Sequence, residues 1–116
     1  TAMNGDVCNK IGTYLKAVVA KENSIPFYVA LPSSTIDKRL DSGIGKIPIE
    51  YREGKELTSM RFLNENKETK IQYIYLNKKN VINLAFDVTP SKFITKLITE
   101  KGICSANKKS ISSLIK

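Results

Sequence analysis

Histidine is missing from this sequence of 116 residues, and cysteine occurs only twice. Ser-His-Asp triads, Cys-His pairs and HExxH zinc sites all need an imidazole, so the sequence excludes these three kinds of catalytic centre. Cys8 and Cys104 form no CxxC pair, and a structural zinc site needs four ligands. The two thiols could pair with each other, but in a reducing compartment we expect them to be free.

Long apolar runs are also missing. No stretch of about 18 apolar residues occurs, so we expect no membrane-spanning helix. The first residues are polar, and no signal peptide is visible there. With 41% hydrophobic residues the chain can build a modest core. We therefore expect a soluble, cytoplasmic protein in which residues 1–116 form one domain or one part of one.

Acidic residues are in the minority, and the formal net charge is +8. Such a charge suits an acidic partner such as nucleic acid. A bias toward A/T-rich codons also explains it, because lysine, isoleucine and asparagine are all abundant. The lysines are dispersed, with doublets only at Lys78-Lys79 and Lys108-Lys109, and arginine occurs only three times. We interpret the charge as a solvated surface and expect no nucleic-acid partner.

The first predicted element is a helix over Asp6–Glu22. Its apolar residues recur at helical spacing, and Asp6 is a good N-cap. Two choices in it are unfavourable: Lys10 opposes the dipole in the first turn, and Gly12 lies inside the helix. A phosphate bound to the first N–H groups would offset the repulsion on Lys10. This favours Asn9 and Lys10 as ligands of a phosphate, although lysines near helix starts often simply reach into water.

The remaining elements predict an α/β protein. Pro26–Pro32 is typical of a buried strand of a parallel sheet, and Ser34 with Asp37 resembles a capping box. Thr89, Pro90 and Gly102 are the start and stop signals of a second long helix. The shorter predictions are a strand over Glu56–Phe62, a turn over Asn64–Lys70, a strand over Ile71–Leu76, a turn over Asn77–Asn80, an extended segment over Val81–Phe86, and a last helix that Ser105 caps and that runs through Leu114.

Several other polar residues have a functional and a structural interpretation. Asp37 and Asp41 can be interpreted as an acid/base pair or as ordinary residues of a solvated helix face. Ser33–Thr35 follows a strand, where α/β folds place ligands, but turn chemistry also explains it. Asp87 precedes a helix and is expected to accept hydrogen bonds from backbone N–H groups. Tyr73 and Tyr75 alternate with Ile74, which suits sheet packing better than base stacking.

Four blocks of the sequence resemble one enzyme family. "NGDVCNKIGTYLKA" resembles a signature of the methylthioribose-1-phosphate isomerases, and "PFYVALPSSTID" resembles the strand and turn that follow it. "IPIEYREGKELT" and "AFDVTPSKFITKLITEKGIC" resemble two later segments of that family, in the same order and with the same spacing. The wider superfamily includes regulatory subunits of translation initiation factor 2B.

The resemblance implies an aldose–ketose isomerase of methionine salvage that acts on 5-methylthioribose 1-phosphate without a metal or organic cofactor. It implies that Asn9 and Lys10 bind the substrate. The catalytic aspartate and cysteine of the family align upstream of Thr1, so Asp6 and Cys8 are neither of them, and we expect no catalytic residue in this chain. It also implies the C-terminal part of a Rossmann-like parallel sheet with flanking helices.

This chain therefore resembles a C-terminal fragment, which is expected to form a homodimer or to pair with a complementing N-terminal chain. The alternative function is that of a catalytically inactive remnant that acts as an interaction or regulatory module. In either case we expect apolar surface to be uncovered along Phe27–Leu31, where a neighbouring strand would pack.

Overall fold

The computed structural model describes residues 1–74 and 81–116, which form two compact units. Unit 1 comprises Thr1–Ile49 and Phe86–Lys116, and unit 2 comprises Glu50–Ala85. Helices and small mixed sheets occur together, which confirms the α/β class. Among the described residues, parallel strand pairing is confined to two strands of unit 1 and one isolated bridge between Ala2 and Asp37.

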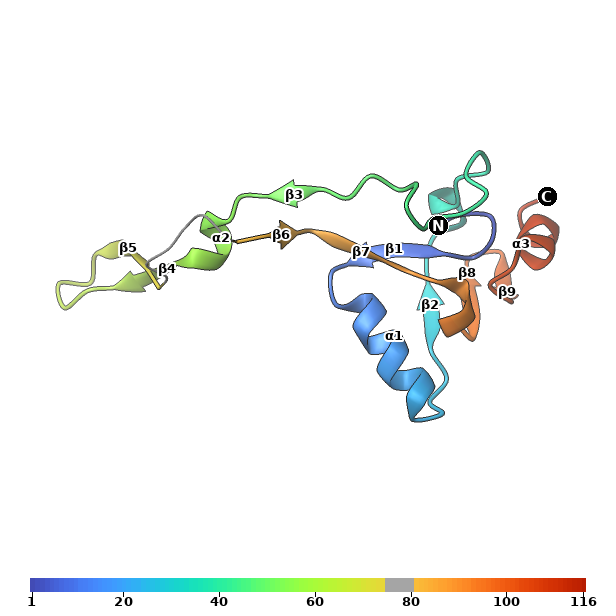
Figure 1. Ribbon diagram of the computed structural model, residues 1–116, viewed down its shortest axis with the longest axis horizontal. Helices are drawn as coiled ribbons and strands as arrows, with labels where there is room; N and C mark the ends of the chain where they lie inside the picture. The colour runs from blue at the N-terminus through green and yellow to red at the C-terminus, as the bar shows by residue number, and fades with distance from the viewer. Residues whose placement is uncertain (75–80) are drawn as a thin grey trace. The chain divides into compact units, whose positions relative to one another are not determined.

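Unit 1 contains two small sheets and two α-helices (Figure 1). In the first sheet, β1 pairs antiparallel with β7, and in the second, β2 pairs parallel with β8, which pairs antiparallel with β9. The elements are β1 (Val7–Lys10), α1 (Thr13–Glu22), β2 (Tyr28–Ala30), the 3-10 turn η1 (Ser33–Thr35), β7 (Phe86–Thr89), the 3-10 turn η2 (Ser91–Phe93), β8 (Lys96–Thr99), β9 (Gly102–Cys104) and α3 (Lys108–Leu114).

Unit 2 contains two short antiparallel pairs and one helical turn. The strand β3 (Tyr51–Arg52) pairs with β6 (Asn83–Leu84), and α2 (Lys55–Thr58) leads into the hairpin of β4 (Ser59–Leu63) and β5 (Thr69–Tyr73). The predicted turn between these two strands is confirmed. The predicted strand over Glu56–Phe62 is correct only in its second half, and the predicted turn over Asn77–Asn80 lies outside the described residues.

The core of unit 1 lies between its strands and α3. Leu97 of β8 and Ile111 of α3 are fully buried, and Met3, Val7, Ile36, Ile94, Cys104 and Ile115 complete the cluster. The strand predicted over Pro26–Pro32 is present as β2, but it is not covered on both faces. It lies at one edge of its sheet, and Tyr28 is 54% exposed. This agrees with the expectation of uncovered surface along Phe27–Leu31.

The first predicted helix was wrong in its first half, where the chain forms β1 instead. Gly12 adopts a φ of +96°, which separates the strand from the helix, so Lys10 is not in a first helical turn and Gly12 is not inside the helix. Asp6 does not cap the helix either. Its side chain is buried at 2% exposure and accepts hydrogen bonds from the Asn4 amide and from backbone N–H groups.

The second predicted long helix was also wrong. Between Phe86 and Cys104 the chain forms β7, η2, β8 and β9. Its isoleucines and threonines are β-branched and suit strands, and pairing with β1 and β2 outweighs the capping signals that were read from the sequence. Thr89 is buried in β7. The last helix starts at Lys108, and Asn107 rather than Ser105 caps it through the N–H of Ser110.

Asp6 connects three segments of unit 1, and its substitution tests this connection. One carboxylate oxygen accepts from the N–H of Ser91 at 2.9 Å, and the other accepts from the N–H of Gly43 at 3.0 Å and from the Asn4 amide at 2.8 Å. Burial raises the pKa of Asp6, but these hydrogen bonds outweigh burial and hold the pKa below its ordinary value. Asp6→Asn should lower the free energy of unfolding by about 2 kcal/mol, because an amide group would face N–H donors.

The same pKa difference fixes the pH dependence of stability. A carboxyl group whose pKa is lower in the folded than in the unfolded state adds to the free energy of unfolding. This addition is complete above the unfolded-state pKa of about 3.9, and it is lost as the pH falls through the folded-state pKa. Urea unfolding at pH 7 and at a pH below 4 should show that the free energy of unfolding falls steeply in acid. The fall should be smaller in the Asp6→Asn variant. Asp41→Asn is the control. The hydrogen bond from Lys108 also lowers the pKa of Asp41, but Asp41 is exposed and solvent screens the pair, so its effect should be the smaller one. An equal effect of the two substitutions would contradict this role of Asp6.

Gly5 and Gly12 provide a matched pair, because their φ angles are +93° and +96°. A Cβ atom on Gly5 would lie 2.5 Å from the backbone carbonyl of Ala106, whereas nothing lies within 4 Å of one on Gly12. Gly12→Ala should therefore lower the free energy of unfolding by about 1–2 kcal/mol, from backbone strain alone. Gly5→Ala should lower it by about 1–3 kcal/mol more. Thermal unfolding of both variants checks this, and equal losses would contradict the close packing at Ala106.

Candidate functional site

Asn9 and Lys10 are the last two residues of β1, and both are exposed. Successive side chains of a strand point to opposite faces, so the two side chains leave β1 on opposite sides. A ligand that contacts both must therefore lie beyond the carboxyl end of this strand. That is the end at which Ile11 and Gly12 turn the chain into α1.

Asp87 of β7 holds the turn between β1 and α1. Its carboxylate accepts hydrogen bonds from the N–H of Gly12 at 2.7 Å and from the N–H of Tyr14 at 3.1 Å. The Thr13 hydroxyl donates to the Lys10 carbonyl at 2.7 Å within the same turn. Gly12 has no side chain with which to cap the helix, so a residue 75 positions away supplies the cap.

These contacts change the predicted anion site. The sequence predicted that a phosphate would bind the first N–H groups of the helix, but the carboxylate of Asp87 already accepts from two of the N–H groups at this end. A phosphate near this turn would therefore depend on the side chains of Asn9 and Lys10. Asp87 was expected to accept from N–H groups, and it does so for α1 rather than for a helix that follows it. No local sequence pattern indicates that Asp87 pairs with α1, because this pairing depends on the register of β1 with β7.

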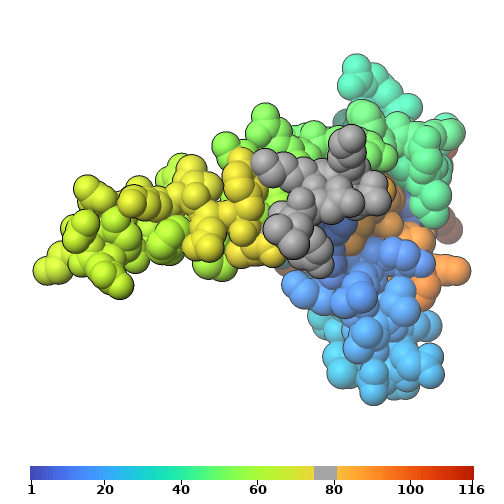
Figure 2. Space-filling model, turned by 60° about the vertical axis from the view of Figure 1, so that its left-hand side comes forward, coloured from blue at the N-terminus to red at the C-terminus, as the bar shows by residue number. Residues whose placement is uncertain are grey.

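An apolar groove runs along α1 beside this turn. Its volume is about 540 Å³, and Leu15 and Val19 are 67% and 54% exposed. The stripe that identified the helix in the sequence is therefore largely uncovered in unit 1, and Figure 2 shows the open surface of the α1 segment in blue. The remaining lining residues are Ile11, Gly12, Tyr14, Val18 and Asp87.

The two cysteines are free thiols, as expected. Cys8 is half-buried on β1, and Cys104 is buried in the core. Burial raises the pKa of both thiols, so both are protonated near neutral pH. Neither thiol has the features of an activated nucleophile.

The other polar candidates have structural roles. Asp37 and Asp41 do not share a helix: Asp37 pairs with Arg39, and Asp41 pairs with Lys108 at 2.7 Å. The capping box predicted at Ser34 is not formed. Instead, the N–H and hydroxyl of the neighbouring Ser33 both donate to the carboxylate of Glu100, at the carboxyl ends of β2 and β8. Across the described residues, no group of three or more Cys, Asp or Glu side chains is arranged to hold a metal ion.

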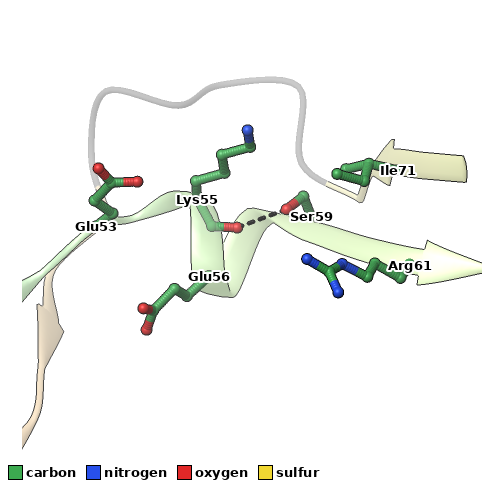
Figure 3. Close-up of a pocket in the computed structure, with 6 residues that line it drawn as sticks. All are labelled: Glu53, Lys55, Glu56, Ser59, Arg61 and Ile71. Atoms are coloured by element: carbon green, nitrogen blue, oxygen red, sulfur yellow. Dashed lines mark hydrogen bonds between the residues drawn. The ribbon is translucent and has the colours of Figure 1, made fainter.

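A separate pocket of about 390 Å³ lies within unit 2 (Figure 3). The hydroxyl of Ser59 donates to the carbonyl of Lys55 at 2.8 Å, and the guanidinium of Arg61 points back along β4 toward it. Glu53, Glu56 and Ile71 complete the lining. The pocket mixes both signs of charge and contains neither Asn9 nor Lys10.

Comparisons with known proteins identify the family of the chain. Residues 1–106 match the model of the Initiation factor 2 subunit family. The chain is 46% identical over 114 residues to a methylthioribose-1-phosphate isomerase of Paramagnetospirillum magneticum, and 47% identical over 114 residues to one of Escherichia coli. Both alignments cover 98% of this chain but only 32% and 30% of the relatives, so the chain spans about a third of their length.

Solved structures give the same result. A 5-methylthioribose 1-phosphate isomerase from Pyrococcus horikoshii superposes with a TM-score of 0.79 at 39% identity, covering 97% of this chain and 29% of that one. The delta subunit of translation initiation factor eIF-2B from A. fulgidus superposes with a TM-score of 0.76 at 35% identity, covering 97% and 30%.

The fold is thus of the α/β class that a 5-methylthioribose 1-phosphate isomerase and an initiation factor subunit also have. The chain belongs to the Initiation factor 2 subunit family. The resemblance seen in the four sequence blocks is thereby confirmed. Among the described residues, no helix has the length and hydrophobicity needed to cross a bilayer.

The raised pKa values of the thiols predict slow alkylation. At pH 7 the native chain should react with iodoacetamide at least about tenfold more slowly than the chain in urea, with Cys104 slower than Cys8 because Cys104 is buried. Mass spectrometry of the labelled peptides measures both rates. Rapid labelling of either cysteine in the native chain would contradict the assignment of both as unreactive thiols.

Proposed function

We propose that the chain is part of an S-methyl-5-thioribose-1-phosphate isomerase of methionine salvage, and that Asn9 and Lys10 bind the sugar phosphate. Identities of 46–47% over 114 residues to proteins of that name support the activity. The observation that carries the site is the exposure of Asn9 and Lys10 at the carboxyl end of β1, next to a turn fixed by Asp87. The chain would then supply part of a Rossmann-like parallel sheet in a cytoplasmic, dimeric enzyme.

The proposed reaction converts an aldose 1-phosphate into a ketose 1-phosphate, with a net shift of hydrogen from C2 to C1. Such a reaction needs groups that take up and return a proton near those carbons. In this chain both thiols are protonated, and the carboxylate of Asp87 is bonded to backbone N–H groups. The proposed contribution of the chain is therefore binding: Lys10 neutralises the phosphate, and Asn9 donates hydrogen bonds.

A second candidate function is that of an interaction module without catalysis. The likeness to the delta subunit of an initiation factor favours it, because that neighbour carries the fold under a different function. The uncovered apolar surface of α1 also suits a partner. A chain that acts in this way would bind no sugar phosphate.

Substitution of Lys10 tests the proposed site. Titration of the 116-residue chain with 5-methylthioribose 1-phosphate, followed by NMR, should shift the backbone signals of Asn9 and Lys10. Lys10→Ala should weaken binding by about 10- to 100-fold, because a charge-assisted hydrogen bond to phosphate contributes roughly 1.5–3 kcal/mol.

Lys16→Ala is the matched control, since Lys16 is an exposed lysine on α1. The affinity of the Lys16→Ala variant should stay within about twofold of that of the unaltered chain, because salt screens the interaction of a solvent-exposed charge with a ligand that it does not contact. If both variants lost the same affinity, the effect of Lys10 would come only from the net charge of the chain and not from contact with the phosphate. Absence of binding by the unaltered chain would favour the interaction module.

A further inference from the structure

We propose that Asp87 is a positioning residue, which holds the turn from Asn9 to Gly12 in the geometry that binds a sugar phosphate; this inference rests on the proposed function. Asp87 lies opposite Asn9 in the register of β1 with β7. Asp87 is thus paired in the strand register with Asn9, a residue proposed to bind the phosphate, and its side chain accepts hydrogen bonds at the start of α1.

The two hydrogen bonds fix both sides of the junction. The one from Gly12 fixes the residue whose φ of +96° redirects the chain, and the one from Tyr14 fixes the first turn of α1. Between them, the Thr13 hydroxyl donates back to the carbonyl of Lys10. Movement of the turn would therefore break contacts on both sides of Lys10, and the carboxylate restrains the position from which its side chain extends.

A second contact from the same segment supports this role. Phe93 of η2 packs edge-on against Tyr14, with ring centroids 5.6 Å apart, and the ammonium of Lys92 lies 5.0 Å from the centre of the Phe93 ring. The segment from β7 to η2 thus holds the first turn of α1 at two points, one polar and one aromatic. Figure 1 shows α1 leaving the end of β1 beside this segment.

Charge alone argues for the opposite effect. A carboxylate that accepts from the helix N–H groups excludes an anion from them, and it repels an anion bound nearby. If Asp87 acted on the ligand only through its charge, its removal would strengthen phosphate binding. If it acts by positioning, its removal weakens binding even though a negative charge is lost. The two interpretations therefore predict changes of opposite sign.

The test compares Asp87→Ala, Asp87→Asn and the unaltered 116-residue chain, with two readouts. Amide hydrogen exchange of Gly12 and Tyr14 reports the cap, and titration with 5-methylthioribose 1-phosphate reports the site. Asp87→Ala should speed both exchange rates and weaken binding by at least about fivefold. Asp87→Asn keeps one carbonyl acceptor, so its exchange rates and its affinity should lie between those of Asp87→Ala and of the unaltered chain. This graded result distinguishes a loss of positioning from a loss that comes only from unfolding.

Asp41→Ala is the control, because Asp41 is an exposed carboxylate of the same unit that pairs with Lys108, and it should change neither readout. Tighter binding by Asp87→Ala, or unchanged exchange of both amides, would overturn the positioning role while the proposed function stands. Absence of binding by the unaltered chain would overturn the proposed function, and the role of Asp87 in ligand binding with it. Faster exchange together with weaker binding supports both.

Discussion

The pairing of β1 with β7 is the contact on which unit 1 depends, because it joins residues 7–10 to residues 86–89. Two carboxylates secure this junction from its two ends. Asp6, just before β1, accepts from the N–H of Ser91, just after β7, and Asp87 within β7 accepts from the N–H groups of Gly12 and Tyr14, just after β1. In both cases an acceptor from one strand segment satisfies donors of the other, so neither segment completes its backbone hydrogen bonds alone.

This junction explains why the proposed site is formed by a short strand rather than by a helix. The N–H groups at the start of α1 would attract an anion, but Asp87 accepts from two of them. The part left for a ligand is the carboxyl end of β1, with Lys10 as its cation and Asn9 as its amide. The thiols of Cys8 and Cys104 stay protonated through burial, which agrees with a binding role for this part of the sequence.

Local pattern predicted the α/β class, the strand at β2, the turn of the hairpin and the second half of the first helix. The prediction from local pattern failed where pairing with a distant strand determines the structure. Asp6 and Thr89 each look like helix caps, yet one is a buried acceptor and the other lies in a strand, because the partner strand was invisible to local signals. Asn9 and Lys10 were predicted as phosphate ligands at a helix start that is in fact the end of a strand, and the family resemblance implies the same two residues. The part played by Asp87 could not be found from the sequence, since it depends on the register between segments that lie more than 70 residues apart.

A crystal structure of the chain with 5-methylthioribose 1-phosphate would show which groups near the end of β1 hold the phosphate. We expect phosphate density beside the ammonium of Lys10 and the amide of Asn9, with Asp87 still bonded to the N–H groups of Gly12 and Tyr14. Phosphate density on those N–H groups, with the carboxylate of Asp87 displaced, would contradict it. So would a ligand bound in unit 2 with the end of β1 empty.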